Sequence, residues 1–189
     1  MKLSKVNEGR KKKIERYYSN KIKDVELLID NVWDPHNVAA IARTADGLGI
    51  ERINLYYTYN KFPNFKDLGK KSSSSANKWI KFDKIGNLEE FASERKKRGW
   101  HFIGSCWKEG AQDLRECSFP DKCIIVLGSE SKGLSLEIEK TCENFIFIPM
   151  VGMTESYNVS VAAALIMYKI FENKGQNLAL RIKDTIRKV

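Results

Sequence analysis

The stretch that most constrains the fold runs from Phe145 to Phe171. Its first residues, 145–148, are β-branched and aromatic, which is typical of a buried strand. Pro149 ends that strand because proline has no amide hydrogen for the ladder. The apolar, alanine-rich segment from Val161 predicts a buried helix. The loop between them is polar and carries Gly, Thr, Glu, Ser and Asn together. A plain connection needs only a cap, so we interpret this loop as a ligand-binding loop at a strand end.

The first half of the chain repeats this pattern. The segment 25–29, Val-Glu-Leu-Leu-Ile, predicts a strand, which is followed by a polar turn and by a small-residue helix from about Val38 to Leu48. The next strand is predicted at 52–57. A strand–helix–strand succession indicates a parallel sheet with right-handed crossovers, so we expect an α/β domain with five or six strands. The remaining predicted elements are a short strand at 79–82, a helix at 88–98, strands at 101–105 and 123–127, and a short helix at 135–142.

Positive charge is concentrated at the two ends of the 189-residue chain. Residues 1–24 hold nine Lys/Arg and three Asp/Glu, a net charge of +6, and residues 172–189 hold five and two, a net charge of +3. The total is +9, so the middle is neutral. We therefore expect a basic helical extension at 1–24, a domain at 25–173 and a basic tail at 174–189. A neutral core with basic ends favours a nucleic-acid partner, although solvated charged ends would also suit solubility.

Several classes of protein are disfavoured by the motifs. No apolar run is long enough to cross a membrane, and the chain begins with basic residues rather than a signal sequence. The four cysteines lack CxxC spacing and only two histidines accompany them, so we expect no metal site and reduced cysteines in a cytoplasmic protein. The loop Gly128–Ser135 lacks the Gly-Lys-Ser/Thr order of a phosphate loop, and no GxGxxG follows the first strand.

Polar loops follow three predicted strands, at Asn31–Arg43, Gly128–Ser135 and Pro149–Ser160. Arg43 lies in an otherwise small and apolar helix. Its guanidinium either faces solvent or points into a site, and periodicity alone does not decide between the two.

The three loops resemble the three motifs of the SpoU–TrmH family of RNA ribose 2'-O-methyltransferases, within the SPOUT class. The resemblance covers roughly residues 10–171. The first motif is NVWDPHNV at 31–38 with Arg43-Thr44-Ala45-Asp46, and the second is IVLGSE at 125–130 with Gly133-Leu134-Ser135. The third is IPM at 148–150 with SYNVSVA at 156–162. The members most similar to this chain methylate guanosine 18 in the D-loop of tRNA. The resemblance implies a deep C-terminal trefoil knot, a homodimer that completes the active site, and S-adenosylmethionine as the cofactor.

The resemblance also assigns site residues. A polar catalytic set would consist of Arg43, Asn37, Glu130, Ser156 and Asn158. The cofactor pocket would be lined by Ser105, Leu127, Gly128, Ile148, Met150 and Tyr157. The positive charge of the sulfonium activates the methyl group for transfer, so the reaction requires no metal. Because arginine stays charged in proteins, we expect Arg43 to contact the hydroxyl or the adjacent phosphate and to stabilise developing oxyanion character.

Two positions depart from the family pattern: Tyr157 stands where leucine is usual, and Cys106 where relatives often have histidine. The chain lacks the separate N-terminal RNA-binding domain of ribosomal-RNA members, which favours tRNA. Three alternatives remain open at this point: another ribose in tRNA or rRNA, a non-catalytic RNA-binding module, and a metabolic α/β enzyme that acts on a phosphorylated small molecule.

Overall fold

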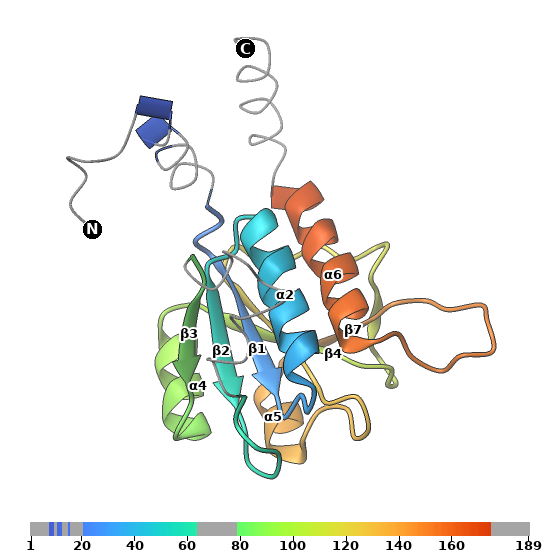
Figure 1. Cartoon of the computed structure of the whole chain (residues 1–189). Helices are drawn as coiled ribbons and strands as arrows, with labels where there is room; N and C mark the ends of the chain where they lie inside the picture. Colours follow the sequence, from blue (N-terminus) through green and yellow to red (C-terminus); the bar gives the residue numbers. More distant parts are fainter. Residues whose placement is uncertain (1–7, 10, 13–14, 16–20, 64–78, 175–189) are drawn as a thin grey trace.

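A parallel sheet forms the centre of the part of the chain that the computed structural model describes, residues 8–9, 11–12, 15, 21–63 and 79–174. Within these residues the sheet has seven strands in the order β3-β2-β1-β6-β4-β7-β5, as Figure 1 shows in part. The strands are β1 (Val25–Asp30), β2 (Arg52–Tyr56), β3 (Lys81–Lys84), β4 (His101–Ser105), β5 (Gln112–Asp113), β6 (Cys123–Leu127) and β7 (Asn144–Phe147). Every adjacent pair runs parallel, which confirms the predicted fold class.

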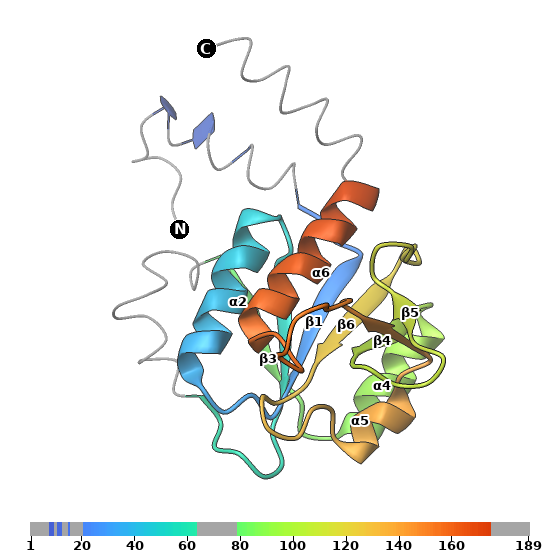
Figure 2. The same ribbon diagram turned by 90° about the vertical axis from the view of Figure 1, so that its right-hand side faces the viewer.

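Helices cover both faces of the sheet (Figure 2). They are α2 (Pro35–Gly47), α4 (Leu88–Lys97), α5 (Leu136–Thr141) and α6 (Val159–Lys174). In the central strand β1, Leu27 and Ile29 pack with α2 and α6, whereas Leu28 packs on the other face with α4 and α5. Because successive strand side chains alternate, a strand between two helical layers must be apolar throughout. This explains the continuous apolar run of β6 and the apolar residues of β1, in which Glu26 and Asp30 are buried polar exceptions.

Two element predictions need correction. Helix α2 begins at Pro35 rather than near Val38, because the Asp34 carboxylate accepts the amide hydrogen of His36 at 2.8 Å and proline is suited to a first helical position. The strand count is seven among the described residues rather than five or six. The missed strand, β5, consists of two polar residues paired with β7, and so short a strand has no periodicity to detect.

Three predictions fall wholly or largely outside the described residues: most of the basic extension at 1–24, the larger part of the loop at 60–78, and the tail beyond residue 174. None of the described helices is long and apolar enough to span a membrane.

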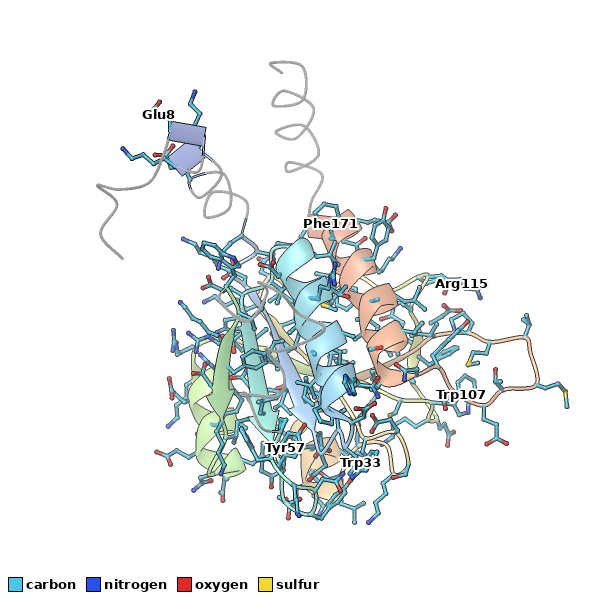
Figure 3. The ribbon with its side chains drawn as sticks, viewed as in Figure 1. Glu8, Trp33, Tyr57, Trp107, Arg115 and Phe171 are labelled. Atoms are coloured by element: carbon cyan, nitrogen blue, oxygen red, sulfur yellow. The ribbon has the colours of Figure 1, made fainter. Side chains whose placement is uncertain are left out.

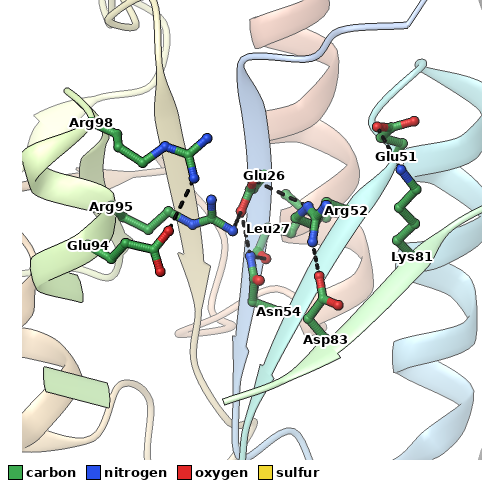
Figure 4. A network of polar contacts seen from close by, with 10 residues as sticks. All are labelled: Glu26, Leu27, Glu51, Arg52, Asn54, Lys81, Asp83, Glu94, Arg95 and Arg98. Atoms are coloured by element: carbon green, nitrogen blue, oxygen red, sulfur yellow. Dashed lines mark hydrogen bonds and ion pairs between the residues drawn. The ribbon is translucent and has the colours of Figure 1, made fainter. Parts of the chain in front are cut away.

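A buried carboxylate links β1, β2 and α4 near the amino ends of the strands (Figure 4). Glu26 is 5% exposed; it accepts a hydrogen bond from the Asn54 amide at 2.9 Å and lies 3.3 Å from the Arg95 guanidinium and 3.5 Å from that of Arg52. Arg95 belongs to the basic run 95–98 at the end of α4, and its guanidinium neutralises a charge inside the fold.

Candidate functional site

The site is placed by the way the chain leaves β1 and β6. These strands are neighbours, yet β1 leads to α2 on one face of the sheet and β6 leads toward α5 on the other. The loops that follow the two strands therefore meet at the carboxyl edge of the sheet, where open α/β sheets bind ligands. A cleft of about 300 Å³ lies at this edge, at the ends of β4, β6 and β7. It is lined by Ser105, Cys106, Trp107, Leu127, Gly128, Ser129, Glu130, Gly133, Phe147, Ile148, Met150, Glu155, Ser156, Tyr157, Val159 and Ala162.

All six residues that the resemblance assigned to a cofactor pocket line this cleft: Ser105, Leu127, Gly128, Ile148, Met150 and Tyr157. They come from the ends of β4, β6 and β7 and from the loop that follows β7. Gly128 is required by the geometry, since a Cβ there would lie 2.3 Å from the carbonyl carbon of Gly133. The two segments therefore touch through their backbones, and this contact shapes one wall of the cleft.

A directional series of hydrogen bonds joins the three polar loops. The backbone N–H and the hydroxyl of Ser160 both donate to the Asn158 Oδ1, at 2.9 and 2.6 Å. Asn158 Nδ2 donates to Asn37 Oδ1 at 3.1 Å, and Asn37 Nδ2 donates to Glu130 Oε1 at 2.6 Å. The second oxygen of Glu130 accepts the backbone N–H of Trp33 at 3.2 Å. Because each amide uses both of its ends, the orientations of Asn37 and Asn158 are set.

Beneath this series, buried polar groups hold the loops together. The Asn31 Oδ1 accepts the backbone amides of Thr58, Tyr59 and Asn60 at 2.9–3.2 Å. Asp30 accepts the amide of Ser135 at 2.6 Å, which connects the end of β1 to the start of α5. Burial raises the pKa of Asp30 above its usual value. Asn31 also has a φ of 53°, a conformation that asparagine tolerates better than most residues.

The structure groups four of the five predicted catalytic residues and separates the fifth. Glu130 and Ser156 line the cleft, and Asn37 and Asn158 belong to the hydrogen-bonded series. Arg43 is exposed on α2 and is not among the residues that line the cleft. Arg43 lies six positions after Asn37, so on a helix the two side chains point about 120° apart.

Sequence reasoning did not assign several lining residues to the site, and Trp107 and Glu155 are the most informative. Trp107 is 78% exposed, and its ring meets Phe147 edge-on at 4.5 Å. The only signal in the sequence was its place just after a predicted strand. Glu155 and Glu130 make the cleft wall acidic, and no lysine or arginine is among its lining residues. Among the described residues, no group of three or more His, Cys, Asp or Glu side chains could hold a metal ion.

Comparison with known proteins extends over most of the chain. A model of the SpoU rRNA Methylase family matches residues 24–168. The tRNA (guanosine(18)-2'-O)-methyltransferase of Thermus thermophilus is 32% identical over 180 residues, which cover 95% of this chain and 89% of that protein. The crystal structure of the Aquifex aeolicus TrmH/SpoU tRNA modifying enzyme superposes with a TM-score of 0.80 at 29% identity, covering 90% of this chain and 85% of that one.

A second solved structure shares the fold at lower identity. It is the SpoU methyltransferase AviRb of Streptomyces viridochromogenes in complex with the cofactor AdoMet. Its TM-score is 0.69 at 22% identity, over 82% of this chain and 59% of that one.

Proposed function

This chain belongs to the SpoU rRNA Methylase family, and we propose that it transfers the methyl group of S-adenosylmethionine to a ribose 2'-hydroxyl of tRNA, at guanosine 18 of the D-loop. The relatives named for this reaction support the choice of substrate. The observation that carries the proposal is the Ser160–Asn158–Asn37–Glu130 series, which draws three loops together beside the cleft. A tRNA substrate fits the cytoplasmic location expected from the sequence.

The cleft fits the proposed cofactor. S-adenosylmethionine carries positive charge on its sulfonium and amino groups, and the cleft offers the carboxylates of Glu130 and Glu155. Its apolar wall, which includes Leu127, Ile148 and Met150, suits an adenine ring. When bound, the cofactor supplies an electrophilic methyl group. The volume of the cleft, about 300 Å³, is at the lower end of the range for ligand pockets.

The residues of the chain would orient the acceptor ribose. Asn37 and Asn158 are held in one orientation by their neighbours, so their positions need no reorganisation during the reaction. Ser156 lines the cleft from the loop after β7 and can offer its hydroxyl to the ribose. Preorganised polar groups of this kind lower a barrier by placing the hydroxyl in line with the methyl group.

A second copy of the chain would bring Arg43 to the site. Val161, Leu165 and Tyr168 recur at helical spacing on α6 and are 41–55% exposed. Together with Ala40 and Thr44 of α2 they line a shallow groove, and Arg43 lies on the same stretch of α2. A dimer that covers this apolar face can direct Arg43 toward the partner's cleft, where its charge would stabilise the developing oxyanion. Sedimentation of the wild-type chain measures its oligomeric state. A monomer would contradict the proposed dimer.

Two further parts of the proposal follow from the family. The segment from β6 to α6 would form a deep trefoil knot, with the loop after β7 as the wall of the cofactor pocket. The domain would extend over residues 25–173, with basic segments at 1–24 and 174–189 that contact the RNA backbone.

Calorimetry with S-adenosylmethionine tests the proposal first. We expect one binding site per chain, together with transfer of a labelled methyl group to unmodified tRNA. A folded chain that binds tRNA but no cofactor would indicate a non-catalytic RNA-binding module. Transfer to a different ribose, in tRNA or rRNA, would retain the reaction and correct the target.

A further inference from the structure

Trp33 presents a large aromatic ring to solvent from a backbone that is held on both sides. The side chain is 74% exposed. The backbone N–H of Trp33 donates to Glu130, and the carbonyl of the preceding residue, Val32, accepts the Tyr57 hydroxyl at 2.8 Å. On the other side, Asp34 caps α2. Figure 3 shows Trp33 and Tyr57 near one another at the carboxyl end of the strands. The segment is therefore ordered, yet the fold leaves the indole uncovered.

The backbone of Trp33 also lies beside the proposed chemistry. The carboxylate that accepts the Trp33 N–H is the one that accepts from Asn37, and Glu130 lines the cleft. A nucleotide whose 2'-hydroxyl reaches this cleft carries its base only a few ångströms from the ribose. An exposed ring on a backbone held beside the cleft offers a stacking surface, and every base has a π-face that can use it.

We propose that the base of the methylated nucleotide stacks on Trp33. This inference rests on the proposed function and adds a residue that positions the substrate nucleotide. Stacking tolerates any base, so Trp33 would contribute affinity and orientation without distinguishing guanine from the other bases.

Trp107 provides a matched control because its exposure, 78%, is similar, while its surroundings differ. Its ring packs edge-on against Phe147, and it lines the cleft on the side of β4 and β7. Each tryptophan follows the carboxyl end of a strand, Trp33 after β1 and Trp107 after β4, and Figure 3 labels both. Loss of the Trp107 ring should weaken cofactor binding, whereas loss of the Trp33 ring should weaken RNA binding.

The test compares Trp33→Ala, Trp33→Phe and Trp107→Ala in the full chain, with calorimetry for the cofactor and steady-state methylation for tRNA. Trp33→Ala should raise the KM for tRNA about tenfold or more, as expected for a lost base–aromatic stack, with the cofactor Kd within twofold of wild type. Trp33→Phe should recover most of that loss. An unchanged KM in Trp33→Ala would overturn the inference.

A tRNA that lacks the base at the methylated position provides the second measurement. Wild type should bind this abasic tRNA as weakly as Trp33→Ala binds intact tRNA, and the two changes together should cost little more than either alone. Fully additive losses of tRNA affinity would overturn stacking. A shift of Trp33→Ala from dimer to monomer in sedimentation would also overturn it, because the ring would then belong to a subunit contact. Failure of the proposed function is distinguishable, because the wild-type chain itself would then transfer no methyl group.

Discussion

Two carboxylates with polar partners lie toward opposite ends of the sheet, and they differ in exposure. Glu26 is 5% exposed and has two guanidiniums and an amide around it (Figure 4). Glu130 is exposed and accepts from one amide side chain and one backbone N–H. A buried charge requires its partners if the fold is to form, whereas exposed polar contacts contribute about 0–1 kcal/mol. The ordered but exposed series at Glu130 is therefore better explained by function than by stability.

The largest effect is expected for Arg43→Ala. The proposed mechanism has no other cation at the reacting hydroxyl, so we expect methylation to be abolished, while cofactor affinity stays within a few-fold of wild type. Turnover by single-turnover transfer to tRNA and affinity by calorimetry are the two readouts. Turnover comparable to wild type would remove Arg43 from the mechanism.

Glu26→Ala should act on stability. It leaves Arg95, whose side chain is 13% exposed, without its carboxylate partner, and the breaking of a buried pair costs about 3–5 kcal/mol. Urea denaturation should show this loss, while turnover per folded molecule stays near wild type. Glu94→Ala, which removes the exposed pair between Glu94 and Arg98, is the control and should change stability by less than about 1 kcal/mol.

The sequence predicted β1 and β6 well because both strands are buried on both faces, and their side chains are therefore mostly apolar, with Glu26 and Asp30 as exceptions in β1. It could not predict β5, whose two residues are polar, or the pairing of Arg95 with Glu26, since residues about seventy positions apart meet only through the fold. The three loops were recognised by their composition and their place after strands. Trp107 was missed because a single residue after a strand has no periodicity to reveal it. Glu155 lies inside the predicted binding loop, but its residue type alone assigned it no role.

Asn37→Ala should lower turnover and leave stability nearly unchanged, which is the opposite of the result expected for Glu26→Ala. Its amide is the middle of the series from Ser160 to Glu130, and loss of one preorganised donor typically lowers turnover by about 100-fold. The free energy of unfolding should change by less than about 0.5 kcal/mol, as for most surface positions. Kinetics and denaturation of the same preparation measure both. A large loss of stability with normal turnover would show that the exposed series is structural.

The smallest effect concerns two cysteines, one in the cleft and one outside it. Burial raises the pKa of both Cys106 and Cys117, so the reactive thiolate is scarce at neutral pH and increases as the pH rises. At about pH 9, S-adenosylmethionine should slow alkylation of Cys106 a few-fold, because Cys106 lines the cleft, and leave Cys117 unaffected. Peptide mass spectrometry resolves the two sites. Equal protection of both would indicate a global effect of the cofactor on the fold.

The most direct test of the account is to map the product. Unmodified tRNA is incubated with the chain and labelled S-adenosylmethionine, and the modified nucleotide is located by nuclease digestion and mass spectrometry, with Arg43→Ala as the inactive control. We expect one 2'-O-methyl group, on guanosine 18, and no product from the variant. Absence of methyl transfer by a folded, cofactor-bound wild-type chain, or equal product from Arg43→Ala, would contradict the account.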